Sequence, residues 1–232
     1  MQAQKITGKY SPSLAVGLAT TVITTAALIG GMHLSRSRYP STDFSRPILG
    51  EKNQPSQTLF GHSSWIYTVA IAPDGETVAS GSYDGSIKIW HLPSGGLTRT
   101  IDAHPDAIAS LAISKDGETL VSGSWDDCIK IWNLRSGNLI RTINSHADDV
   151  KAVAIAPDGE TIAAGTYSGI IKLWNSKTGE QIGQLKHTGA VKSVSISPDG
   201  KYLASGSRNG TIKVWQLDTG WELTMKGHKR AV

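Results

Sequence analysis

Large apolar and small residues alternate along the chain from residue 57 onward, and the alternation recurs in four gapless copies. In the first copy, Val69 and Ile71 fall on one face while Thr68 and Ala70 fall on the other. A period of two predicts β-strands, and this division of sizes suits a strand packed closely on both faces. Each strand is followed by a PDG or KDG turn signal, a second strand, a tight turn such as YDG, and a third strand ending in tryptophan.

The tryptophans set the period of the repeat. Trp90, Trp132, Trp174 and Trp215 are 42, 42 and 41 residues apart, and the stretch after each one supplies a fourth strand. Four short strands in a unit of about 42 residues are typical of a β-propeller blade. The sequence therefore predicts an all-β fold, with blades at about 62–103, 104–145, 146–186 and 187–227.

A histidine stands 28 residues before each of these tryptophans, and most second strands carry an SGS motif. Over residues 57–232 this combination resembles the WD-repeat (β-transducin-like) propeller family, in the form of bacterial-type tandem repeats. The resemblance implies a hydrogen-bonded tetrad of histidine, serine or threonine, aspartate and tryptophan in each blade. The implied residues are His62, Ser80 or Ser82, Asp84 and Trp90; His104, Ser122 or Ser124, Asp126 and Trp132; His146, Thr166 and Trp174; and His187, Ser205 and Trp215.

The tetrads are expected to be structural, because histidines about 42 residues apart fall on different blades and cannot form one catalytic or metal site. A buried carboxylate needs hydrogen-bond donors, which imidazole, turn amides and a hydroxyl supply. Ser168 and Asn209 replace the aspartate in the third and fourth repeats. We therefore expect the networks of those two blades to be neutral and weaker.

The resemblance also implies a partner-binding rim at the end where the inner strands begin. Family members contact partners three and five positions after the histidine and just before the tetrad aspartate. Aromatic and arginine side chains are the residue types that dominate interface hot spots. The rim residues expected here are Trp65, Tyr67, Tyr83, Trp125, Asp149, Lys151, Tyr167, Lys192 and Arg208.

The N-terminal part of the chain differs in character from the repeats. A basic tail, residues 1–13, precedes a hydrophobic segment, 14–34, and a linker follows at 35–56. Residues 14–32 carry no charge, and as a helix they would rise about 28 Å, close to the thickness of a bilayer core. We expect a helix that serves as a single-pass membrane anchor. A cleaved signal, giving a secreted or periplasmic protein, and a soluble segment are the alternatives, and flanking charges leave the orientation open.

The net charge of +4 lies entirely outside the repeats. Residues 1–56 hold six Lys and Arg against two Asp and Glu, whereas residues 57–232 hold 17 of each sign. This balance argues against nucleic-acid binding by a basic face. The repeats contain no recognisable catalytic, cofactor or metal motif, so no catalytic residue, cofactor or metal ligand is expected.

Two expectations follow for the whole protein. The first is a membrane-tethered scaffold for protein partners, with a regulatory fragment of a larger signalling protein as the alternative and an enzyme disfavoured. The second is an incomplete ring, because QTLFGH at 57–62 resembles an opening strand without a host and His228 starts a fifth unit. A truncated product and a partial sequence are the favoured explanations, and other chains that supply the missing blades are a third.

Overall fold

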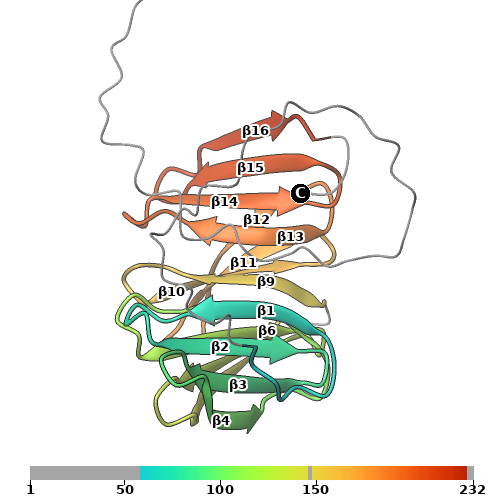
Figure 1. The fold of residues 1–232 in the computed structure, drawn as a ribbon. Helices are drawn as coiled ribbons and strands as arrows, with labels where there is room; N and C mark the ends of the chain where they lie inside the picture. Colours follow the sequence, from blue (N-terminus) through green and yellow to red (C-terminus); the bar gives the residue numbers. More distant parts are fainter. Residues whose placement is uncertain (1–57, 146–147, 229–232) are drawn as a thin grey trace, which may run out of the picture.

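Sixteen strands form four antiparallel sheets of four strands each. The computed structural model describes residues 58–145 and 148–228, and these ranges contain no helix. The all-β prediction and its four blades are confirmed (Figure 1). The expected anchor at 14–34, the tail and linker around it, and the end of the fifth unit at 229–232 lie outside the described residues.

Each blade consists of four consecutive strands, ordered from the inner edge outward. Blade one comprises β1 (Ile66–Ile71), β2 (Thr77–Ser82), β3 (Ser86–His91) and β4 (Gly96–Asp102). Blade two comprises β5 (Ile108–Ile113), β6 (Thr119–Ser124), β7 (Cys128–Asn133) and β8 (Leu139–Asn144). Blade three comprises β9 (Val150–Ile155), β10 (Thr161–Thr166), β11 (Ile170–Asn175) and β12 (Gln181–Lys186). Blade four comprises β13 (Val191–Ile196), β14 (Tyr202–Ser207), β15 (Thr211–Gln216) and β16 (Glu222–Lys226).

The aspartate of the DG signal builds the turn between the first two strands. In blade one, Asp74 accepts hydrogen bonds from the backbone amides of Glu76 and Thr77, at 2.8 and 2.9 Å. Gly75 follows with a φ of 71°, a left-handed conformation that costs glycine nothing. The turn thus reverses the chain within a few residues and delivers β2 in register with β1.

Consecutive blades pack face to face, and their inner strands contact in the order β1, β5, β9 and β13. We call the side of a blade that faces the preceding blade its leading face; in blade two it carries Ile108, Leu111 and Leu120. The opposite side is the trailing face; in blade one it carries Ala79, Ile87, Ile89 and Ile101. These two groups of side chains form one buried cluster, and equivalent clusters join blade two to three and blade three to four.

The expected opening strand at 57–62 is wrong for its described part. Residues 58–65 form no strand, and Phe60 is largely exposed. A single segment has no ladder of its own, and each of the four sheets already has its outermost strand. The segment instead packs locally, with Gly61 so close to the Trp90 ring that a Cβ there would lie 2.9 Å from it.

Candidate functional site

The structure brings the implied tetrad of blade one together. His62 Nε2 lies 2.7 Å from Ser80 Oγ, and His62 Nδ1 lies 3.2 Å from Asp84 Oδ2. The indole of Trp90 donates to the same Ser80 oxygen at 2.9 Å. Of the two candidate serines, Ser80 therefore belongs to the tetrad, while the Ser82 hydroxyl accepts from the Asp84 amide at 3.1 Å.

Blade two repeats this network with a shorter contact between the histidine and the aspartate. His104 lies 2.7 Å from Ser122 Oγ through Nε2 and 2.8 Å from Asp126 Oδ2 through Nδ1. Trp132 donates to Ser122 at 2.9 Å, and Ser124 accepts from the Asp126 amide at 3.1 Å. The two networks fasten the turn before the third strand to the histidine loop and to the outer half of the blade.

Both carboxylates are held in their charged form. Burial raises the pKa of Asp84, but hydrogen bonds from Ser86 and from the Ser63 amide, with the neighbouring His62, lower it well below its ordinary range. Burial likewise raises the pKa of Asp126. The hydrogen bond and charge of His104, together with the Cys128 amide, lower it by more, so the pKa is lowered overall. The donors thus outweigh the desolvation in each blade.

Blade three departs from the implied tetrad, and the assignment of Thr166 needs correction. Ala164 stands opposite Val153 in the sheet, the place that Ser80 holds opposite Val69. Thr166 lies two residues further along and donates to the Ile170 carbonyl at 3.0 Å, within its own turn. His146 lies outside the described residues.

Blade four has the tetrad residues but not their hydrogen bonds. The buried His187 Nε2 and Ser205 Oγ have no hydrogen-bond partner among the described residues, and Trp215 donates instead to Glu222 at 3.2 Å. Burial, together with the nearby charge of Lys213, lowers the pKa of His187. Asn209 takes the place of the aspartate and donates to Thr188 at 2.6 Å.

A lysine two residues before each tryptophan has a structural role that the tetrad analysis overlooked. Lys130 Nζ donates to the Ala103 carbonyl and Lys172 Nζ to the Ser145 carbonyl, both at 2.6 Å. The same ammonium groups lie 5.9 and 6.0 Å from the ring centres of Trp132 and Trp174. The recurring I-K-x-W motif was the sequence signal that could have revealed them.

The rim residues are carried by turns that share one backbone hydrogen bond. In each blade, one amide of this turn donates a hydrogen bond of 2.8 to 3.0 Å to the backbone carbonyl of the residue three positions after the blade's histidine. The donating amides are those of Tyr83, Trp125, Tyr167 and Arg208. This bond fixes the turn between the second and third strands against the entrance of the inner strand. The four turns therefore present their side chains at the same end of every blade.

The aromatic rim residues of blades one and two form one connected cluster. Ring centres are 6.2 Å apart for Tyr67 and Tyr83, 5.5 Å for Tyr67 and Trp125, and 6.0 Å for Tyr83 and Trp125. Trp65 joins through Tyr83 at 6.4 Å. Trp65 and Tyr83 are exposed, whereas Tyr67 and Trp125 are half-buried beneath them.

Blade three extends this cluster with a cation. Lys151 Nζ lies 3.9 Å from the centre of the Trp125 ring and 5.5 Å from that of Tyr167, within the range of cation–π attraction. It also forms an ion pair with Asp149 at 2.7 Å. The aromatic surface of two blades is thereby continuous with the polar rim of the third.

Blade four adds positive charge to the rim. Lys192 and Arg208 are both exposed. Burial lowers the pKa of Lys192, as do the charges of Lys151 and Arg208, so these three cations lie within electrostatic reach of one another. The structure thus gathers all nine expected rim residues into a surface that is aromatic at one end and basic at the other.

Among the residues that the structure describes, no group of three or more His, Cys, Asp and Glu side chains could hold a metal ion. The same part of the chain has no helix long and apolar enough to cross a bilayer.

Comparison with known proteins places these observations in a family. The model of the WD domain, G-beta repeat, matches residues 53–91, 95–133, 137–175 and 179–216, more than half of the chain. Curated relatives match over single repeats. The small ribosomal subunit protein RACK1 of Medicago sativa is 48% identical over 46 residues, which cover 20% of this chain and 14% of the relative. The vegetative incompatibility protein HET-E-1 of Podospora anserina is 50% identical over 48 residues, 21% of this chain and 4% of the relative.

Solved structures match over most of the described fold. The structure of U3-55K and the crystal structure of the RRP9 WD40 repeats each align with a TM-score of 0.71 and 26% identity over 76% of this chain. The chain spans 56% and 55% of their lengths, respectively, and far less of the curated relatives. Repeat model, blade topology and structural neighbours agree, and this chain belongs to the WD-repeat family of β-propeller proteins.

Proposed function

We propose that this chain is a protein-interaction scaffold that binds its partners across the rim. WD-repeat proteins generally act in this way and are typically not enzymes. The observation that carries the proposal is the connected cluster of Trp65, Tyr67, Tyr83 and Trp125, with Lys151 over the Trp125 ring. Rigid aromatic groups that are partly exposed and partly supported from below bind with little loss of conformational entropy.

The charge of the rim specifies the chemistry of the partner. Asp149 compensates Lys151, but Lys192 and Arg208 are exposed and have no acidic neighbour at hydrogen-bonding distance among the described residues. A partner segment with an apolar or aromatic anchor and an acidic group beside it matches both halves of this surface. Tethering through residues 14–34 remains a prediction from the sequence.

The test uses the rim tryptophan and a matched tryptophan elsewhere. Trp125→Ala removes the centre of the aromatic cluster, so we expect the chain to capture its partners at least about tenfold more weakly, as for a hot spot worth more than 1.4 kcal/mol. Trp221→Ala is the control, because Trp221 is half-exposed and precedes β16, at the opposite end of β15 from the rim turn. The measurement is quantitative affinity purification followed by mass spectrometry, with folding checked by circular dichroism.

A second variant separates charge from aromatic contact. Exchanging Lys192 and Arg208 for glutamate should weaken binding of the same partners and reverse its salt dependence, because salt then screens a repulsion. If a chain carrying Trp125→Ala with both charge reversals kept every partner of the wild type, the rim would not be the binding surface.

A further inference from the structure

The leading face of blade one is exposed where the other leading faces are buried. Ile66 is 51% exposed and Val69 44%, whereas their counterparts in blade two, Ile108 and Leu111, are 0% and 7% exposed. Val150 in blade three and Val191 in blade four hold the same position as Ile66, and both are 0% exposed. Three apolar side chains, with Ile71 at 65%, therefore form an unpaired copy of a surface that is covered three times within the same chain.

The trailing face of blade four is also more exposed than the trailing faces of the other blades. Ile212 is half-buried, although the residues at its register in the other blades, Ile87, Ile129 and Ile171, are fully buried. Met225 pairs with Ile212 as Ile101 pairs with Ile87, and it is 42% exposed where Ile101 is 9% exposed. The second half of an interblade interface is thus presented without a partner among the described residues.

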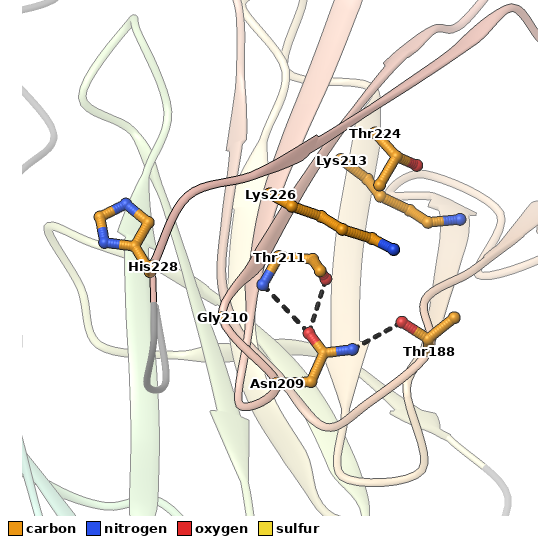
Figure 2. Close-up of a pocket in the computed structure, with 8 residues that line it drawn as sticks. All are labelled: Thr188, Asn209, Gly210, Thr211, Lys213, Thr224, Lys226 and His228. Atoms are coloured by element: carbon orange, nitrogen blue, oxygen red, sulfur yellow. Dashed lines mark hydrogen bonds between the residues drawn. The ribbon is translucent and has the colours of Figure 1, made fainter.

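A depression of about 830 Å³ lies at the rim end of blade four, where its lining joins Gly210 to leading-face residues such as Lys213 and Thr224. Figure 2 shows its lining side chains. Asn209 forms hydrogen bonds with both Thr188 and Thr211, and Lys213 and Lys226 lie above it in this view. Gly210 in this lining corresponds to Gly85 and Gly169. Both of those glycines lie directly against backbone carbonyls of the following blade's histidine loop, whereas Gly210 borders the depression.

The two end blades also carry the two halves of a hydrogen bond that recurs between neighbouring blades. The amide of Leu111 donates to the Thr68 hydroxyl of the preceding blade at 3.1 Å, and the amide of Val153 donates to Ser110 at 3.0 Å. Ser193 holds the same position in blade four and is exposed. In β1, Val69 holds the position that Leu111 holds in blade two. If a strand with the sequence of β1 packed against blade four, the amide of its Val69 could donate a hydrogen bond to the Ser193 hydroxyl.

We propose that two copies of this chain associate head to tail, with the leading face of blade one in each copy against the trailing face of blade four in the other. The argument for a second copy is continuity with the internal interfaces, because every copy carries both halves of a contact that it already makes three times. A head-to-tail contact closes when its rotation divides a full turn. Two four-bladed arcs would give a ring of eight blades, within the range of known propellers.

The first experiment measures the mass of the protein. The full chain, purified in a mild detergent, should show twice its 24.7 kDa monomer mass by light scattering coupled to size exclusion, with detergent mass subtracted. Val69→Arg blocks the leading face and Met225→Arg the trailing face, and both positions are exposed, so the fold should persist by circular dichroism. Each variant should raise the dissociation constant at least about 100-fold. Ile140→Arg, an equally exposed apolar position on β8, should leave the dimer intact.

A mixing experiment tests the head-to-tail arrangement. A heterodimer of the Val69→Arg and Met225→Arg chains retains one wild-type contact, so mixing the two monomeric variants should restore dimers weaker than the wild type. A chain with both substitutions should not be rescued by either single variant. A monomeric wild type, a dimer that survives both single substitutions, or the absence of rescue on mixing would overturn the proposal, and the first outcome would assign the two faces to further blades or to another protein.

Discussion

At the residue scale, hydrogen bonding separates the first two blades from the last. Blades one and two hold an ionised aspartate between a histidine, a hydroxyl and turn amides. Blade four has Asn209 instead, and its His187 Nε2 and Ser205 Oγ have no hydrogen-bond partner among the described residues. Charge-assisted hydrogen bonds contribute about 1.5–3 kcal/mol to stability, roughly twice the value of neutral ones. The stability that the tetrads contribute is therefore concentrated in the first half of the repeats.

The carboxylate of Asp126 makes this contribution dependent on pH. Because its pKa in the folded state is lowered, its stabilisation is present above the ordinary aspartate pKa of about 4 and is lost as the pH falls below it. Asp126→Asn should lower the free energy of unfolding by about 1.5–3 kcal/mol at pH 7 and by much less at pH 3. Denaturant titrations at the two pH values measure both differences, with Asp102→Asn, at an exposed position on β4, as the control. Equal losses at both pH values would contradict the role of the charge.

At the element scale, the second strand of each blade carries a glycine that receives a side chain from the next blade. A Cβ on Gly81 would lie 2.7 Å from Ile108, and one on Gly123 would lie 2.6 Å from Val150. Gly165 is equally close to Val191. The S-G-S motif is therefore a packing device between blades as well as part of the tetrad.

Gly165→Ala tests this packing. The added methyl group overlaps Val191, so we expect a loss of about 1–3 kcal/mol in the free energy of unfolding. Val191→Ala alone should also destabilise, because it leaves a cavity. The double variant should lose clearly less than the two single losses combined, since the smaller side chain makes room for the methyl group. Denaturant unfolding of the four proteins gives the coupling energy, and strict additivity would show that the two residues do not meet.

At the scale of the whole molecule, blades two and three are covered on both faces, whereas blades one and four each have one face against which no other described blade packs. In a stack of repeats, stability depends on interfaces between neighbours, so end units open more readily than central ones. The expected difference between end and central blades applies to a monomer, in which the four blades form a single arc.

Hydrogen exchange should reveal that gradient. In the Val69→Arg chain, which is designed to be monomeric, amides of β2 and β14 should exchange at least about tenfold faster than those of β6 and β10. These are the second strands of their blades, so the comparison is matched in position. Mass spectrometry of peptic fragments provides the measurement. Uniform exchange across all four strands would instead indicate that the arc opens as one cooperative unit.

The sequence by itself determined the elements and most of their contacts within a blade. The period of two, the DG turns and the spaced tryptophans specify four strands in each repeat, because these are local properties of the chain. The resemblance to WD repeats also located the tetrads of blades one and two and the rim turns. The sequence alone did not show which of the two hydroxyl positions in the S-G-S motif belongs to the tetrad, and so did not show that Thr166, at the position of Ser82, lies outside it.

Tertiary structure decided everything that depends on which surfaces meet. Residues 58–62 have a strand-like sequence but no neighbour to pair with, so they form no strand. Val69 and Leu111 occupy the same position in the repeat, yet one is exposed and the other buried, because only the second has a blade in front of it. Trp215 donates to Glu222 and Trp132 to Ser122 for a similar reason: hydrogen bonds form with the groups that packing brings within reach, and repeated sequence does not guarantee repeated surroundings.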